Sequence, residues 1–360
     1  MPVGDVAGRK NMLQHHFSKE PSLPPTRTTR PRAAVVLSHS LKHELFGPAD
    51  WADLADVAEV VAECEDSTAL SVHPRRHEAE VLVTSWGMPR LTEQVLSDLP
   101  ALRVVAYAAG SVRGLVSEAV WARDIVVVSA AEANNEPVAE YVYAQTVLAL
   151  KDVHRRAHRI RTARELPTLD GIPGIYGQRV GLVSFGSIAR KVAARLRHLE
   201  AHVMAWDPHI PPEALGRLSV EPVDELEDLF ARSLVLSVHA PLIPGQTEKL
   251  ITGELLRRLP HGATLINTAR GAVVDEDALV DVLRERPDLY AVLDVTTREP
   301  LSPSSPLYAL PNVMLTGHVA GTVSGERRAM GRLVIEELRR VADGTSPLHA
   351  VSADSSLLRA

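Results

Sequence analysis

Ionisable side chains follow several of the apolar, strand-like segments in the second half of this 360-residue chain. In open α/β sheets, ligands bind in loops at the carboxyl ends of the strands, so residues in such loops can meet at one edge. The residues are Asp207, His239, Arg270, Asp294, Glu299 and His318. Each alone has an ordinary structural explanation, such as a surface ion pair or a hydrogen-bonded histidine. Together they form a candidate catalytic set.

This set offers the groups that interconversion of a 2-keto acid and a 2-hydroxy acid requires. An arginine such as Arg270 presents a planar fork that binds a carboxylate through two hydrogen bonds. Histidine as a residue type titrates near neutrality, and a residue such as His318 can therefore protonate a keto oxygen. A carboxylate such as Glu299 beside it would stabilise the protonated ring. A nicotinamide can carry the hydride, so this chemistry requires no metal.

Residues 180–208 predict a dinucleotide-binding unit. An apolar segment suited to a buried parallel strand is followed by a turn, an amphipathic helix and a second strand. The turn SFGSIA stands where a dinucleotide fold has G-x-G-x-x-G; Ser184 and Ala189 replace the outer glycines, and Gly186 is kept. Asp207 follows roughly 20 residues later, at the spacing of an acid that binds the adenosine ribose. The turn alone also fits an ordinary strand–turn–helix unit.

Apolar strand-like segments alternate with helical ones from residue 33 onwards, which predicts parallel β-α-β units. The predicted fold is α/β, with two Rossmann-like domains and a cleft between them. One domain comprises residues 33–133 and, through a returning final helix, 322–345; the other comprises 134–321. A helical stretch over 136–164 is expected, with Pro137 in its first turn. Residues 1–32 are expected to be a disordered extension and 346–360 a tail.

Composition limits the remaining classes of function. A net charge of −6 gives no reason to expect a nucleic-acid partner. No apolar run approaches the roughly 18 residues of a membrane-spanning helix, so no membrane partner is expected. A single cysteine, Cys64, excludes an internal disulfide and a cysteine-based zinc site. It fits a cytoplasmic protein.

Several motifs, in matching order, resemble the D-isomer-specific 2-hydroxyacid dehydrogenases from about residue 75 to 340. The strongest are LINTARGAVVDE at 265–276, LDVTTREPL at 293–301 and LTGHVAG at 315–321. VHAPL at 238–242 and ANNEPVAE at 133–140 also fit. The resemblance implies an NAD-dependent 2-ketoacid reductase that forms a D-2-hydroxy acid or runs the reverse reaction. It also implies a flavodoxin-like substrate-binding domain, a doubly wound NAD-binding domain and a homodimer.

Roles for individual residues follow from this resemblance. Arg270 matches the arginine that holds the substrate, His318 the general acid/base, and Glu299 its carboxylate partner. Asp207 matches the ribose-binding acid and implies NAD rather than NADP, while Asp294 matches the acid that bonds the nicotinamide amide. The other implied cofactor contacts, besides His318, are Ser184, Phe185, Gly186, Ser187, Ile188, His239, Ala240, Pro241, Thr268 and Ala269.

The implied substrate contacts depart from the family pattern at one position. They are Trp86, Gly110, Ser111, Arg113 and Arg270. Arg113 stands where the family commonly has an aspartate. If it faces the cleft, it would favour a small-molecule substrate with a second anionic group, such as a phosphorylated, phosphonate or dicarboxylic keto acid. The alternative is that Arg113 points to solvent.

Two other functions stay open at the level of sequence. One is a non-catalytic NAD(H)-binding regulator on the same fold. The intact set of Arg270, Glu299 and His318 argues against it, because a sensor does not need all three. The other is formate oxidation, whose chemistry needs no histidine–carboxylate pair.

Overall fold

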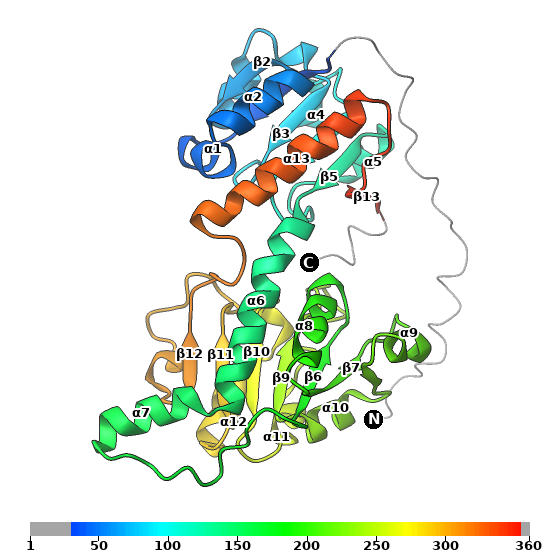
Figure 1. Cartoon of the computed structure of the whole chain (residues 1–360). Helices are drawn as coiled ribbons and strands as arrows, with labels where there is room; N and C mark the ends of the chain where they lie inside the picture. The colour runs from blue at the N-terminus through cyan, green and yellow to red at the C-terminus, as the bar shows by residue number, and fades with distance from the viewer. Residues whose placement is uncertain (1–29, 354–360) are drawn as a thin grey trace.

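Residues 30–353 are described by the computed structural model and form two sheets, in the upper and lower halves of Figure 1. Residues 1–29 and 354–360 lie outside the described residues, with most of the expected extension and part of the expected tail. The predicted α/β class with two Rossmann-like units is confirmed. The exact domain boundaries stay a prediction.

The first sheet has the strand order β13-β5-β4-β3-β1-β2. Its strands are β1 (Arg32–Val36), β2 (Glu59–Cys64), β3 (Val81–Thr84), β4 (Val104–Tyr107), β5 (Val126–Ser129) and β13 (Ala350–Val351). Its helices are α1 (His39–Leu45), α2 (Pro48–Val57), α3 (Ser67–Val72), α4 (Glu93–Ser97), α5 (Glu118–Ala122) and α13 (Arg327–Ala342). Alternate strand residues enter two apolar cores, one shared with α1, α2 and α13, the other with α3, α4 and α5.

The second sheet has the order β12-β11-β10-β9-β6-β7-β8 and is parallel throughout. Its strands are β6 (Arg179–Val183), β7 (His202–Trp206), β8 (Glu221–Pro222), β9 (Val235–Val238), β10 (Thr264–Asn267), β11 (Tyr290–Leu293) and β12 (Val313–Leu315). Helices α6 (Ala131–Leu150) and α8 (Ser187–Arg197) cover one face. Helices α10 (Leu226–Arg232), α11 (Gly253–Arg257) and α12 (Glu276–Glu285) cover the other, and α9 (Pro212–Gly216) lies near β8. The order reverses between β6 and β9, the position at which such sheets bind ligands.

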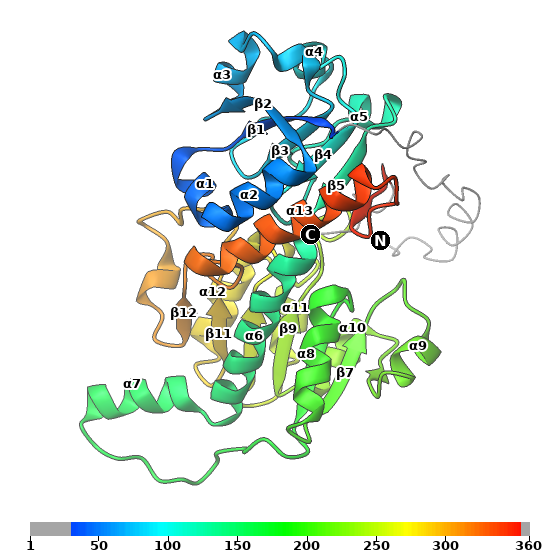
Figure 2. The same ribbon diagram turned by 45° about the horizontal axis from the view of Figure 1, so that its top comes forward.

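Helix α6 runs from the first sheet down along the second (Figure 2). The single helix expected at 136–164 is wrong in two respects. α6 begins at Ala131, so Pro137 lies inside it, and the missing N–H removes only one hydrogen bond of the helix. It ends at Leu150, and α7 (Val153–Ala163) follows Asp152, whose φ of 54° is left-handed and interrupts the helical backbone.

The expected tail at 346–360 is also corrected in part. Ala350–Val351 pairs antiparallel with β5, and Val351 is 3% exposed. The segment before it is held by two hydrogen bonds of the His349 backbone, one to a backbone N–H and one to a side chain. Ser129 N–H donates to the His349 carbonyl at 3.2 Å, and His349 N–H donates to Glu337 Oε2 at 3.2 Å. A strand this short carries no periodic signal in the sequence.

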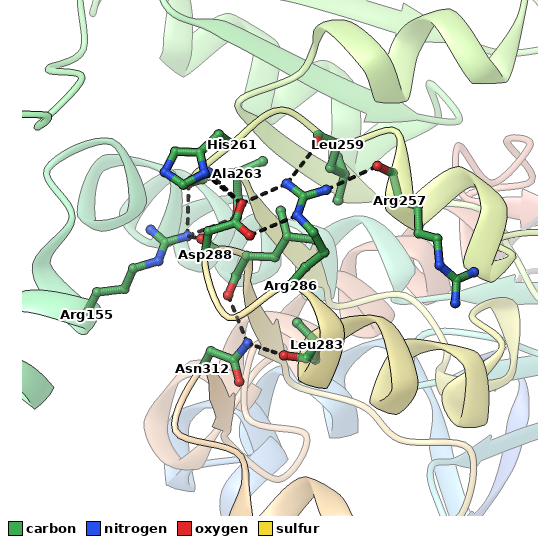
Figure 3. A network of polar contacts seen from close by, with 11 residues as sticks. Arg155, Arg257, Leu259, His261, Ala263, Leu283, Arg286, Asp288 and Asn312 are labelled. Atoms are coloured by element: carbon green, nitrogen blue, oxygen red, sulfur yellow. Dashed lines mark hydrogen bonds and ion pairs between the residues drawn. The ribbon is translucent and has the colours of Figure 1, made fainter.

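A polar network at the amino-terminal edge of the second sheet anchors α7 (Figure 3). Arg155 donates through Nη2 to the carbonyls of Gly262, Ala263 and Asp288 at 2.9–3.0 Å. Arg286 donates to both carboxylate oxygens of Asp288 and lowers the pKa of that group to about 2. This network lies at the opposite edge from the loops that carry the predicted site.

None of the helices between residues 30 and 353 has the length and apolar character needed to cross a membrane. The cytoplasmic location expected from Cys64 stays a prediction.

Helix α13 approaches α1 closely at Gly331, where an added Cβ would lie 2.1 Å from the carbonyl oxygen of Leu45. We therefore expect Gly331→Ala to force the two helices apart and to lower the free energy of unfolding by about 1–3 kcal/mol. Urea denaturation measures this change. Gly325→Ala is the matched control, because a Cβ there meets nothing within 4 Å. Equal stability of the two variants would contradict the close packing.

Candidate active site

The loops that follow β9, β10 and β11 open onto a cavity of about 470 Å³ between the two sheets. Residues from the loops after β3 and β4 of the first sheet and from α6 and α13 complete its wall. The sequence-predicted residues that line it are Trp86, Gly110, Ser111, Ile188, His239, Thr268, Ala269, Arg270, Asp294 and His318. The structure thus brings predicted substrate residues and predicted cofactor residues together in one cavity.

His318 and Glu299 meet at the edge of this cavity. The Nδ1–H of His318 donates to Glu299 Oε2 at 2.7 Å. Because Nδ1 is engaged, Nε2 is the ring nitrogen that can exchange a proton with a ligand. The His318 side chain is 51% exposed, so a ligand can reach it. The pair therefore has the geometry of an acid/base with an orienting carboxylate.

The loop that carries His318 has an unusual backbone. Gly317 has a φ of 71° and His318 a φ of 65°. A proline at position 317 is locked near −65° and could not adopt this conformation, which explains the glycine there. His318 is held in its left-handed conformation by its own N–H, which donates to the Asp294 carbonyl at 2.6 Å.

The Asp294 carboxylate holds the same loop through hydrogen bonds. Its Oδ1 accepts from Thr316 Oγ1 at 2.6 Å and from Val319 N–H at 2.8 Å, and its Oδ2 accepts from Ala320 N–H at 3.0 Å. Asp294 is 2% exposed. Tyr141 of α6 extends the network, since its hydroxyl lies 3.0 Å from Thr316 Oγ1. The position of His318 is thus set by a buried carboxylate at the end of β11.

The loops of Arg270 and Glu299 are in direct contact. A Cβ on Gly271 would lie 1.9 Å from the carbonyl carbon of Thr296, so only glycine allows this approach. Thr296 N–H donates to Glu299 Oε1 at 3.2 Å, and Thr297 N–H donates to Glu276 Oε2 at 2.7 Å. These contacts hold Glu299 beside His318.

Arg270 is partly buried, and its Nη1 donates to the Ala269 carbonyl at 2.6 Å. Burial lowers the pKa of its guanidinium; the charge of Glu299 opposes this shift, and the charge of Arg113 adds to it. Arg113 is therefore near enough to repel Arg270. Among the described residues that line the cavity, however, Arg113 does not appear.

The glycine-containing turn lines a second cavity, of about 410 Å³. Its predicted members are Ser184, Gly186, Ser187, Ile188, His239 and Pro241. Ser184 replaces the first glycine and has a φ of 69°, a left-handed conformation that glycine adopts more easily. Gly186 begins α8 without a side-chain cap, so the first amides of the helix can serve an anionic ligand.

The other predicted cofactor residues, Phe185, Asp207 and Ala240, line neither cavity. Phe185 and Ala240 are 0% and 2% exposed, so their side chains lie in the core. Asp207, at the end of β7, accepts hydrogen bonds from Ser184 Oγ at 3.1 Å and from Phe185 N–H at 2.7 Å. It braces the turn in this structure.

Two buried polar atoms test whether a dinucleotide fits. Neither His239 Nε2 nor Thr268 Oγ1 has a hydrogen-bond partner within residues 30–353. Burial lowers the pKa of His239 to about 4, so its ring is neutral at pH 7. Buried groups without partners are costly, and a polar ligand in the cavity would relieve that cost. These atoms and the uncapped α8 fit a dinucleotide. No cluster of three metal-ligating side chains occurs between residues 30 and 353.

Some residues at the site were missed by sequence reasoning. Arg327 lines the first cavity, with its guanidinium carbon 5.3 Å from the centre of the Trp86 ring. Asn134 Oδ1 accepts from the N–H and the hydroxyl of Thr322 at 3.1 and 3.0 Å. His349 lines the second cavity. Asn134 lies in the ANNEPVAE motif at 133–140. No sequence pattern at the arginine-rich start of α13 distinguishes Arg327 as a site residue.

Comparisons with known proteins agree with this geometry. Residues 144–320 match the model of the D-isomer specific 2-hydroxyacid dehydrogenase NAD-binding domain. The chain is 34% identical over 253 residues to the (S)-sulfolactate dehydrogenase of Chromohalobacter salexigens, covering 70% of this chain and 81% of that protein. It is 29% identical over 296 residues to the D-3-phosphoglycerate dehydrogenase of Methanocaldococcus jannaschii, covering 81% of this chain and 56% of that one.

The chain thus spans about half the length of the phosphoglycerate dehydrogenases that it matches. Among solved structures, it is similar to the NADPH-dependent glyoxylate/hydroxypyruvate reductase of Sinorhizobium meliloti. The TM-score is 0.71 at 25% identity, covering 92% of this chain and 100% of the other. The resemblance seen in the sequence motifs is confirmed, and the chain belongs to the D-isomer specific 2-hydroxyacid dehydrogenase family.

Proposed function

We propose that the chain is an NAD-dependent oxidoreductase that interconverts a 2-keto acid and a D-2-hydroxy acid. The observation that carries this proposal is the meeting of Arg270 with the hydrogen-bonded pair Glu299–His318 around one cavity. A non-catalytic nucleotide sensor would have no use for an acid/base pair beside a partly buried guanidinium.

Each of these residues has a defined task in the proposed reaction. Arg270 binds the substrate carboxylate and directs the keto oxygen towards His318. His318 Nε2 donates a proton to that oxygen during reduction and removes it during oxidation. Glu299 accepts the Nδ1–H and balances the charge of the protonated ring. NADH, when bound, supplies the hydride to the keto carbon.

We propose that the cofactor is NAD and that it spans both cavities. Gly186, Ser187 and Ile188 at the start of α8 would hold the pyrophosphate. His239 and Thr268 would offer their buried polar atoms to the nicotinamide half. Asp207 would bind the adenosine ribose and disfavour a 2′-phosphate by charge repulsion.

We propose a substrate with a second anionic group. Support comes from the charge of Arg113, which acts on Arg270 and adds positive potential at this site. Both sulfolactate and 3-phosphoglycerate, after which two of the relatives are named, carry such a group.

We also propose that two domains close over the substrate, with boundaries at 133/134 and 321/322. One domain comprises 33–133 and 322–345, and the other 134–321. The two chain segments that pass from one domain to the other are joined by the hydrogen bonds from Thr322 to Asn134. A hinge there would let closure exclude water during the reaction.

Replacement of the acid/base residue tests the reaction. We expect His318→Ala to lower turnover by about two to four orders of magnitude because the proton donor is lost. NADH affinity, measured by fluorescence titration, should persist. His261→Ala is the control, since His261 is exposed at the opposite edge of the sheet. Unimpaired turnover in His318→Ala would remove that residue from its role.

Removal of the charge at position 207 tests cofactor choice. Asp207→Asn keeps an acceptor for Phe185 N–H but no longer repels a 2′-phosphate. We expect the ratio of kcat/KM for NADH to that for NADPH to fall at least about tenfold, a change of roughly 1.4 kcal/mol. Asp224→Asn, at an exposed acid in the same half of the molecule, is the control. A ratio that does not change would refute selection by Asp207.

We further propose a homodimer that uses the arm formed by α7 and the loop to residue 177, which projects from the second sheet (Figures 1 and 2). Leu166, Leu169 and Tyr176 are 86%, 77% and 76% exposed on it. A cluster of large exposed apolar side chains is typical of an interface. We expect Leu166→Glu with Leu169→Glu to shift the mass measured by light scattering towards the monomer. Val72→Glu, at an equally exposed apolar site on α3, should not. A monomeric wild type would overturn the proposal.

A further inference from the structure

We propose that Arg327, which is in cation–π contact with Trp86, is a second anion-binding residue of the first cavity. It would select 2-keto acids whose far end carries a sulfonate, phosphonate or carboxylate. This inference rests on the proposed function and names the side chain that contacts the second anionic group.

Arg327 lies on the opposite side of the first cavity from Arg270. Arg327 and Arg270 both line the same cavity of about 470 Å³, together with His318. They come from opposite sides of it, since Arg270 follows β10 of the second sheet and Arg327 begins α13, which packs on the first. A short substrate held by Arg270 at its carboxylate and by His318 at its keto oxygen would present its far end to the first-sheet wall.

The guanidinium of Arg327 contacts the aromatic ring of Trp86. Its carbon lies 5.3 Å from the centre of the Trp86 ring, a distance that suits a cation–π contact. Trp86 is 40% exposed and lines the same cavity, so the ring is a wall and not part of the core. The contact with the ring limits the positions open to the guanidinium, which reduces the entropy lost on binding an anion.

The guanidinium of Arg327 has more N–H donors than its two partners among residues 30–353 use. Nη1 of Arg327 is paired with Glu44, and Nε donates to the Thr322 carbonyl at 3.4 Å, which is a weak contact. Guanidinium carries five N–H donors, so these partners leave capacity for a ligand. Arg327 is only 27% exposed, and a charge-assisted bond in such a sheltered place is stronger than one at the open surface.

Arg113 has a different relation to the site. Its charge acts on Arg270, but it is not one of the described residues that line the cavity. We therefore assign contact with the second anionic group to Arg327 and a longer-range electrostatic effect to Arg113. The two assignments predict different outcomes when each arginine is replaced.

The test compares substrates in the full-length protein with NADH. The probes are oxaloacetate and sulfopyruvate, which carry a second anionic group, and 2-oxobutyrate, a monoanion of similar length. We expect Arg327→Ala to lower kcat/KM for the two dianions by about 10- to 100-fold, the loss of one or two charge-assisted hydrogen bonds. Its kcat/KM for 2-oxobutyrate should change less than about threefold. Arg327→Lys keeps the positive charge but loses the planar guanidinium. Its kcat/KM for the two dianions should lie between the values of the wild type and of Arg327→Ala.

Two further variants separate binding from structure. Glu44→Gln breaks the same ion pair without removing the cation. If Arg327 matters only through its ion pair with Glu44, Glu44→Gln should reproduce Arg327→Ala; if Arg327 binds substrate, the preference for dianions should persist or grow. Arg332→Ala is the control for helix charge, because this arginine of α13 is 66% exposed and pairs with Asp50.

Three results would overturn the inference. They are an unchanged ratio of dianion to monoanion kcat/KM in Arg327→Ala, loss of the preference in Arg113→Ala alone, and a wild type that prefers 2-oxobutyrate. A protein that binds NADH but reduces none of the three acids would overturn it as well. A protein that neither binds NADH nor oxidises it with any keto acid would instead refute the proposed function.

Discussion

The buried carboxylate of Asp294 is the point on which the geometry of the site depends. A carboxylate removed from water must be fully hydrogen-bonded, and the available donors are those of the loop after β12. Thr316, Val319 and Ala320 supply them, so the loop has to wrap around Asp294. This wrapping forces the left-handed backbone at His318 and points its ring towards Glu299.

The same carboxylate can still take part in cofactor binding. An ionised carboxylate has about four lone-pair sites, and Oδ1 accepts two hydrogen bonds while Oδ2 accepts one. One site on Oδ2 accepts no hydrogen bond from residues 30–353, and the family resemblance implies that the nicotinamide amide bonds this carboxylate. The Asp294 side chain would then both position His318 and bind the nicotinamide. This would fix the proton donor and the hydride source relative to each other.

The sequence could predict what depends on local pattern. Continuous apolar segments identified most strands, and the residues just past them identified Arg270, Asp294, Glu299 and His318. What it could not predict depends on contacts between distant segments. Arg327 lines the cavity because α13 returns to the first sheet, and β13 forms because β5 offers an unpaired edge. Pro137 lies within α6 because burial of Val138 and Val142 against the sheet outweighs one missing hydrogen bond.

The central claim is that this constellation reduces 2-keto acids with NADH. The most direct measurement is the rate of NADH oxidation by the full-length protein with a panel of 2-keto acids, followed by chiral analysis of the product. We expect NADH-dependent reduction of at least one keto acid to its D-2-hydroxy acid. A protein that binds NADH tightly yet leaves every acid of the panel unreduced would contradict it.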